Sequence, residues 1–414
     1  KDVPAAMAAD KAAAVKAVDD LKAANGSLAA IKAAEATLAG LPKDEVAAKA
    51  AYTAARTSNA ARANPPLRHA QPFPGKDEAT QNIARKNFLA LVFCLMIGTA
   101  ALPHILMRYY TTPSVKEARE SVSWSLFFIF LLYFTAPALA VLAKYEVYTV
   151  LVNTPFDKLP EWIARWSAVD KSLLSVVDIN KDGILQLAEM SIGGDIIVLA
   201  TPEIGGLPYV ISGLVAAGGL AAALSTADGL LLTIANALSH DLYYKVLDPN
   251  ASTARRVAVS KALLLVVALC AAYVAAQKPA DILFLVSAAF SFAAATFFPA
   301  LTLGIFWKRA NKWGASLGML AGLGVTFYYM ITTQPWLYKL THGGSALTPE
   351  ILKANTWWDI APISAGLFGV PVGFAVIIIV SMLTKAPGKE IQDLVEHVRF
   401  PSLDGKTSGG SAAH

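Results

Sequence analysis

Long apolar runs alternate with short polar connections over most of the chain. Seven such runs occupy residues 85–108, 122–143, 207–240, 262–276, 281–306, 314–332 and 361–384. Most are close to the roughly 20 residues that a membrane-spanning helix needs, although the fourth is short. The pattern therefore predicts an all-α integral membrane protein with seven transmembrane helices.

The first 64 residues follow a different pattern. Ala alternates there with Lys, Asp and Glu, which favours helix, while "ANGS" at residues 24–27 and "GLP" at residues 40–42 interrupt it. We expect two or three thin helices. Because alanine buries little apolar area, this extramembrane segment should cohere only weakly, and we interpret it as a solvated appendage. Residues 63–76 read as a Pro-rich linker.

Composition agrees with a membrane protein and constrains its topology. Hydrophobic residues make up 55% of the 414 residues, and the formal net charge is +5. The basic residues stand in short clusters between apolar runs, so they indicate topology and not a nucleic-acid-binding face. The basic loops around residues 108–119, 245–261 and 308–312 should be cytoplasmic. The N-terminal segment and the loop at 144–206 should then lie outside.

The sequence offers little support for an enzyme. Cys94 and Cys270 each lie deep in an apolar run, so a disulfide framework is not indicated. The sequence also shows no nucleotide loop, nucleophile triad or thiol and histidine metal cluster. The chain opens at Lys1 without an initiator methionine, and we expect it to be a fragment of a longer protein.

The third apolar run carries polar groups near mid-membrane. Ser225 and Thr226 stand among small residues, and Asp228 follows three residues after Ser225, on roughly the same helical face. Small residues with hydroxyls also serve plain helix packing. An ionisable group near the bilayer centre, however, costs several kcal/mol unless it meets a cation, a partner or water. The run is therefore the first candidate for chemistry.

A second irregularity lies in the first apolar run. Gly98 frees the backbone, while Pro103 lacks an N–H and disfavours helix at Leu102, so we predict a break near mid-membrane. Broken helices at that depth line cavities, where their free backbone groups bind substrates or ions. A mere proline kink is the alternative. His104 is a candidate substrate or proton partner, or a structural hydrogen-bonder.

The stretch "DINKDGILQLAE", residues 178–189, matches the calcium-loop pattern D-x-[DN]-x-[DN]-G-x5-E. An entering helix is predicted from apolar residues at helical spacing from Ile163 through Leu173 to Val177, but Gly193 and Gly194 shorten the exit helix. The alternatives are a calcium staple, a turn leading into a capped helix, or a calcium switch on transport. The predicted ligands are Asp178, Asn180, Asp182, the Ile184 carbonyl and Glu189.

Three separated motifs carry a family resemblance. The stretches "GTAALPHILMRYYT", "AAALSTADGLLLTIANALSHDLYYK" and "FFPALTLGIFWKRANKWGASLGMLAG" resemble the sodium:solute symporter family, most closely its cation/acetate symporter branch, over roughly residues 78–390. The resemblance implies a LeuT-type fold, in which two inverted five-helix repeats surround a central site. The seven segments would be the second repeat plus two extra transmembrane helices, and the N-terminal half of the transporter would be missing from this chain.

The same resemblance assigns site residues. It places the sodium contribution of the third run at the Ala222 carbonyl and the Ser225 and Thr226 hydroxyls. Asp228 departs from the neutral residue of many relatives, so it becomes a second cation or proton site. The substrate pocket would be lined by the broken helix and its neighbour, namely Gly98, Thr99, Ala100, Ala101, Leu102 and His104.

The sequence thus predicts sodium-coupled symport of a small monocarboxylate, acetate by resemblance, in the plasma membrane, the inner membrane of a bacterium. The expected partners are the carboxylate substrate, the lipid bilayer and the missing half, and the expected ions are sodium and calcium. The predicted domains are 1–77, a transporter core at 78–390 and a cytoplasmic tail at 391–414. A membrane sensor built on a symporter core is the alternative, although the tail is too short for a kinase or receiver domain, and a channel is a third option.

Overall fold

The computed structural model describes residues 3–24, 28–62, 72–73, 75–109, 112–180 and 182–399. Within these residues, seven helices are long and apolar enough to cross a membrane. They are Glu78–Arg108, Val115–Leu151, Tyr209–Leu247, Thr253–Ala276, Ile282–Phe306, Lys312–Thr333 and Pro362–Leu383. Each contains or overlaps one predicted run, so the prediction of an all-α integral membrane protein is confirmed.

The chain divides into two compact units, which are described separately. The first combines Lys1–Pro66 with Ala143–Ala200, and the second combines Leu67–Leu142 with Thr201–His414. The predicted domain boundaries after residues 77 and 390 stay predictions. The Pro-rich linker at 63–76 falls almost wholly outside the described residues, and so does the tail from residue 400 onward.

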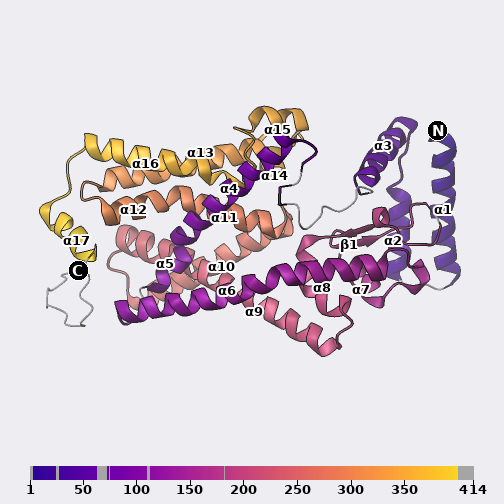
Figure 1. The fold of residues 1–414 in the computed structure, drawn as a ribbon, viewed down its shortest axis with the longest axis horizontal. Helices are drawn as coiled ribbons and strands as arrows, with labels where there is room; N and C mark the ends of the chain where they lie inside the picture. Colours follow the sequence, from indigo (N-terminus) through magenta and orange to yellow (C-terminus); the bar gives the residue numbers. More distant parts are fainter. Residues whose placement is uncertain are drawn as a thin grey trace. The chain divides into compact units, whose positions relative to one another are not determined.

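The second unit contains the transmembrane helices (Figure 1). Its long helices are α4 (Glu78–Ala101), α6 (Val115–Glu146, whose last turn belongs to the first unit), α9 (Tyr209–Asn236), α10 (Thr253–Ala276), α11 (Ile282–Thr296), α13 (Lys312–Thr333) and α16 (Gly366–Leu383). The shorter elements are α5 (Pro103–Tyr109), the π-helical η5 (Ala237–Leu247), α12 (Phe298–Phe306), α14 (Pro335–Thr341), α15 (Pro349–Asn355), the 3-10 turn η6 (Pro362–Ser364) and α17 (Lys389–Arg399).

Four helices, α4, α11, α13 and α16, form the tightly packed group of this unit. Glycines set the spacing, because they let backbones touch. A Cβ atom built on Gly322 of α13 would lie 2.2 Å from the Ala295 carbonyl oxygen of α11. One built on Gly369 of α16 would lie 2.1 Å from the Thr326 hydroxyl of α13. Small residues at such contacts are how membrane helices gain van der Waals packing without a hydrophobic driving force between them.

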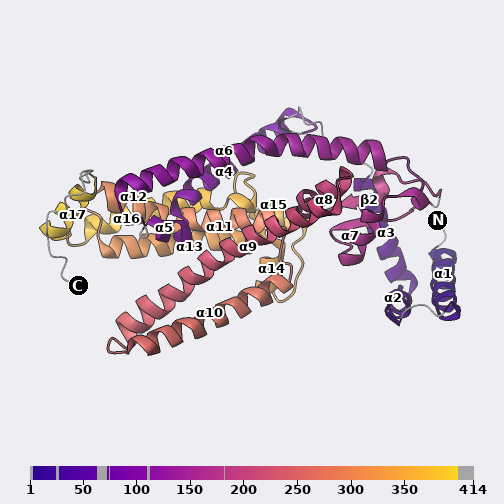
Figure 2. The same cartoon turned by 90° about the horizontal axis from the view of Figure 1, so that it is seen from below.

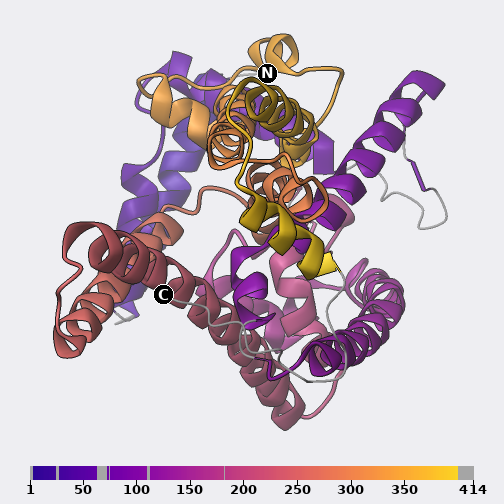
Figure 3. The ribbon, with the colours of Figure 1, turned by 90° about the vertical axis from the view of Figure 1, so that its left-hand side faces the viewer.

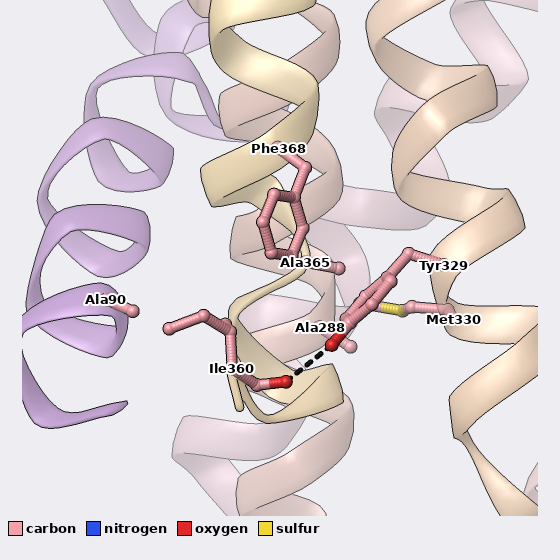
Figure 4. Packing of buried hydrophobic residues seen from close by; sticks show 7 residues of the cluster. All are labelled: Ala90, Ala288, Tyr329, Met330, Ile360, Ala365 and Phe368. Carbon is pink, nitrogen blue, oxygen red and sulfur yellow. Dashed lines mark hydrogen bonds between the residues drawn. The ribbon is translucent and has the colours of Figure 1, made fainter. Parts of the chain in front are cut away.

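An apolar cluster fills one end of this group (Figure 4). Tyr329 of α13 is fully buried and packs with its ring centroid 4.9 Å from that of Phe368 on α16. Its hydroxyl donates a hydrogen bond of 2.5 Å to the Ile360 carbonyl oxygen, so the polar end of the ring is satisfied. Nearby, the Asn87 amide of α4 donates to the Asp359 carbonyl oxygen at 2.8 Å. The segment before α16 is thereby attached to both α13 and α4.

The remaining long helices contribute little to this core. In the apolar windows of α9 and α10 no residue is buried within the described chain. These two helices contact each other, and Figure 2 shows them running side by side. The fourth predicted run looked short because charged residues begin its helix: α10 starts at Thr253, after a Ser252 cap whose hydroxyl accepts a hydrogen bond from the Arg255 N–H. The complete helix has 24 residues.

The first unit confirms the expected thin N-terminal helices. They are α1 (Val3–Ala23), α2 (Leu28–Ala39) and α3 (Glu45–Arg62). Few of their side chains are buried, Val18 and Ala48 among them. The Tyr52 hydroxyl donates to the Asp10 carboxylate at 2.7 Å, joining α3 to α1. The weak apolar burial is what the alanine-rich composition led us to expect. Polar contacts such as this one link the helices in addition.

The rest of the first unit surrounds residues 178–189. After α6 come η1 (Val147–Leu151, π-helical), η2 (Phe156–Lys158), α7 (Glu161–Val169), β1 (Leu174–Val176), η3 (Leu187–Glu189), β2 (Met190–Ile192), η4 (Gly194–Ile196) and α8 (Ile197–Ile204, which continues into the second unit). Strands β1 and β2 pair antiparallel, with Val176 opposite Met190. The short element η3 also contacts α3.

The predicted entering helix of the calcium loop was therefore wrong beyond Val169. The Asp170 carboxylate accepts hydrogen bonds of 2.8 Å from both the backbone N–H and the hydroxyl of Ser172. This local turn competes with the helix and ends it. Leu173 follows as part of a turn, and the next residues form β1. The loop at 178–189 thus connects two short strands, and the element directly before it is β1 and not a helix.

Candidate functional site

The first apolar run breaks where proline chemistry predicts. Helix α4 ends at Ala101, Leu102 has an extended backbone with φ −67° and ψ 120°, and α5 begins at Pro103. The carbonyl of Leu102 accepts from the backbone N–H groups of Ile105 and Leu106, each at 3.1 Å, and so begins the second helix. Pro103 has no N–H to donate to the Thr99 carbonyl, which lies four residues earlier. The predicted break is confirmed.

The predicted pocket residues around the break point in two directions. Gly98, Ala101 and Leu102 are buried, whereas Thr99 and Ala100 are exposed. Gly98 packs against α11 so closely that a Cβ there would lie 2.4 Å from the Phe290 carbonyl oxygen. The buried residues therefore fix the break against the helix group. Thr99 and Ala100 take no part in this packing, and their role in a substrate pocket stays a prediction.

The third run presents its polar groups outward on α9. Ala222, Ser225, Thr226 and Asp228 are all exposed within the described chain. The Thr226 hydroxyl donates a hydrogen bond of 3.2 Å to the Ala222 carbonyl, so these two predicted ligands lie one turn apart on one face. Hydroxyl and carbonyl oxygens are hard donors that suit an alkali cation. A single helix supplies only part of a coordination shell, so the residues fit a contribution to a sodium site.

The structure brings the broken helix and α9 together. Helix α5 contacts α9, and a Cβ built on Gly229 would lie 3.8 Å from the His104 Cβ and 3.5 Å from an Arg108 guanidinium nitrogen. Gly229 directly follows Asp228, so α5 meets α9 beside the predicted ion-binding residues. The Nδ1 atom of His104 is buried and has no hydrogen-bond partner within the described part of the chain.

Arg108 is the residue that sequence reasoning missed here. The sequence places it in a basic cytoplasmic loop, but the structure sets its side chain beside Gly229 of α9. The available signal was its spacing, because residues four apart on a helix share a face and His104 lies four positions earlier.

The acidic loop forms a second candidate site, in the first unit. One carboxylate oxygen from each of Asp178, Asp182 and Glu189 lies within 4.8 Å of the others. A buried oxygen of Asp178 has no hydrogen-bond partner among the described residues. Three carboxylates at this separation repel one another unless a cation or donors lie between them.

Backbone and side-chain donors hold the loop in shape. Glu189 is 2% exposed, and it accepts from the backbone N–H groups of Ile179 at 2.7 Å and Gln186 at 3.0 Å. The Asn180 side-chain amide donates to Asp182 at 2.8 Å, so one predicted ligand is tied to another. Ile184 forms an isolated bridge with Pro155. Gln186 and Glu189 form a capping box on η3, which is the capped turn of the alternative interpretation.

Comparisons with known proteins relate part of the chain to a family of transporters. Residues 197–322, which include α9 and the first half of α13, match the model of the sodium:solute symporter family. This segment is similar to that family, and with seven apolar helices among its described residues the chain is a multi-pass membrane protein of a bacterial inner membrane.

Two curated proteins to which the chain is similar are also transporters by name. The chain is 50% identical over 397 residues to an uncharacterized symporter of Cupriavidus necator, covering 96% of this chain and 57% of that protein. It is 28% identical over 335 residues to a monocarboxylic acid transporter of Corynebacterium glutamicum, covering 80% of this chain and 52% of that protein. The chain thus spans about half the length of these relatives. No solved structure matches.

Proposed function

We propose that the protein carries out sodium-coupled symport of a small monocarboxylate, with acetate as the first candidate, by alternating access. The observation that carries the proposal is the contact of the broken helix α4–α5 with α9 at Gly229, beside the residues predicted to bind the cation. The family match over residues 197–322 supports solute symport, and the relative named as a monocarboxylic acid transporter favours that substrate class.

In this proposal sodium is one of the two transported species. The Ala222 carbonyl with the Ser225 and Thr226 hydroxyls supplies one side of its shell, and the resemblance to the family assigns the other side to transporter sequence outside these residues. Sodium bound to both sides would hold α9 against that partner and so favour the outward-open state. Asp228, midway along the apolar helix, would take a second cation or a proton, because a lone carboxylate is costly at that depth.

The substrate is assigned to the break. The exposed residues Thr99 and Ala100 and the unpartnered Nδ1 of His104 lie on adjoining turns. A protonated His104 Nδ1 would donate to a carboxylate oxygen, and the small exposed residues would leave room for a short methyl group. The pocket of Gly98, Ala101 and Leu102 would then act through position, by holding the break against α11.

Uptake of labelled acetate tests the proposal. Cells producing the transporter that contains this chain would be compared in sodium buffer and in a buffer with an impermeant cation, at fixed external pH. Sodium-dependent uptake, with competition by propionate and pyruvate, supports both halves of the proposal. Acetate uptake that follows the proton gradient and ignores sodium would remove sodium from it, and no acetate uptake in either buffer would remove the substrate.

A second proposal concerns calcium at the acidic loop. The supporting observation is the convergence of three carboxylates around a buried, unpartnered oxygen of Asp178. Oxygen-only donors with three formal charges suit calcium better than a transition metal. We assign the calcium ion a structural role, in which it stabilises this loop of the first unit. Calcium titration of the purified protein, read as its thermal midpoint with magnesium as comparison, would show no shift if the loop is only a turn.

A further inference from the structure

A groove of about 730 Å³ opens at one end of the tightly packed helix group. It lies where α12 ends, α13 begins and α16 ends, and the first turn of α17 closes one side. Three predicted spans therefore terminate at the same place, at Phe306, Lys312 and Leu383. In a bilayer this is the level at which hydrocarbon gives way to headgroups. Figure 3 looks onto this end of the unit, with α17 in yellow.

The inner part of the groove is apolar and open. Ala300 and Gly304 of α12, Ile377 of α16 and Ile391 of α17 line it. A Cβ built on Gly304 would meet nothing within 4 Å, so the space beside this glycine is free. Most glycines of α13 and α16 differ from it, because a Cβ there would meet a neighbouring backbone or side chain; they are Gly314, Gly318, Gly322, Gly366, Gly369 and Gly373. The groove is therefore room that the helix group does not itself fill.

The outer rim of the groove is basic. Lys312 and Lys385 are exposed on it, and neither forms an ion pair with a residue that the structure describes. Lys312 stands 5.7 Å from the ring centroid of Trp313, which is itself 60% exposed. Exposed aromatic and basic side chains at a span end are the usual contacts of a membrane interface.

Hydrogen bonds fix this rim in place. The Asn311 side chain caps α13 by accepting from the Gly314 N–H at 2.9 Å, and it also donates to the Thr384 hydroxyl at 2.7 Å. Arg309 donates to the carbonyl oxygens of Met382 and Thr384, at 3.2 and 3.0 Å. The start of α13, which is the positive end of its helix dipole, thus faces the same rim as the two lysines.

Helix α17 has the pattern of a helix that lies along a membrane surface. Ile391, Leu394 and Val395 form one stripe, and the first two are exposed, at 53% and 59%. The polar face is attached to the loop before α13 by an ion pair of 2.7 Å between Lys308 and Glu396. An exposed apolar stripe beside an interfacial groove is stable when lipid covers it.

We propose that this groove binds an anionic phospholipid of the bilayer, with its phosphate between Lys312, Lys385 and the start of α13 and the upper part of one acyl chain along Gly304 and Ile391. The charge of the rim and the depth of the groove both fit a phospholipid. The rim is cationic, the interior is apolar, and the two meet at the depth where a phospholipid changes from headgroup to chain. The site is separate from the symport residues and does not rest on the proposed substrate.

The first test compares lipid binding by the purified chain in detergent. Native mass spectrometry would measure retention of phosphatidylglycerol against phosphatidylcholine for the wild type, for Lys312→Gln with Lys385→Gln, and for the control pair Lys339→Gln with Lys353→Gln. The control lysines are also exposed and lie beyond the other end of α13. We expect the groove pair to weaken phosphatidylglycerol binding about 30-fold, the result of two contributions of about 1 kcal/mol. The control pair should leave it unchanged.

A second variant tests the proposed position of the acyl chain. Gly304→Leu would place a side chain in the free space, at a position where a Cβ meets nothing within 4 Å, so the thermal midpoint should hold while phosphatidylglycerol retention falls. Equal retention of both lipids by the wild type would overturn the proposal, as would equal losses in the two lysine pairs. Unchanged retention in Gly304→Leu would overturn the groove as the site. A dimer that Gly304→Leu abolishes would show that a second copy occupies it instead of lipid.

Discussion

Replacing Gly322 by alanine should weaken the helix group measurably. The added Cβ would lie 2.2 Å from the Ala295 carbonyl oxygen and 3.2 Å from that of Gly369. Both obstacles are backbone atoms, so α13 has to move away from two neighbours at once. Overpacking of this kind costs about 1–3 kcal/mol, and the better helix propensity of alanine returns about 1 kcal/mol. We therefore expect the free energy of unfolding to fall by up to about 2 kcal/mol.

Gly324 supplies the matched control, because it lies on the same helix and a Cβ there meets nothing within 4 Å. Gly324→Ala gains the propensity without the clash, so its stability should hold or rise by up to about 1 kcal/mol. The assay is denaturant unfolding of each purified variant in one detergent, followed by tryptophan fluorescence. Equal midpoints for Gly322→Ala and Gly324→Ala would show that the close contact of α13 with α11 and α16 does not limit stability.

Three further predictions concern the candidate sites. Ser225→Ala combined with Thr226→Ala should raise the sodium concentration for half-maximal acetate uptake several-fold, because two of the proposed ligands are lost; Thr233→Ala, which removes another back-bonded hydroxyl of α9, should not. Asp228→Asn should change the pH profile or ion stoichiometry of uptake, and an unchanged profile would leave the carboxylate a structural group. Glu189→Gln should reduce the stabilisation of the protein by calcium while leaving its response to magnesium as before, and a parent protein without any calcium shift would refute the staple.

The periodicity of apolar residues was enough to predict the membrane helices. Long hydrocarbon runs have few alternatives in a bilayer, so all seven spans were found from sequence. The break at Leu102 was predictable for a similar reason, since Pro103 removes a hydrogen bond whatever surrounds it. The start of α10 at Thr253 was not visible, because the helix continues beyond the apolar window through charged residues such as Arg255.

Local competition and tertiary contact explain what sequence could not give. The spacing from Ile163 to Val177 fits a helix, but the Asp170 side chain satisfies the next backbone N–H and ends it. Spacing shows only that Arg108 shares a helix face with His104; its position beside Gly229 depends on how α5 crosses α9. The roles of the ion-binding residues stay predictions, since on α9 they face outward from the described chain.

The way Glu189 is held bears on how the acidic loop could respond to an ion. Its carboxylate already gathers backbone donors from both ends of the loop, from Ile179 and from Gln186, and β1 and β2 close the base. A cation would bind to carboxylates that are already in position, and its binding would not move a helix. Sensor loops transmit a signal by opening a helix pair, whereas this one has no such lever. A bound ion would therefore make the loop more rigid, and it would not change the arrangement of helices elsewhere in the chain.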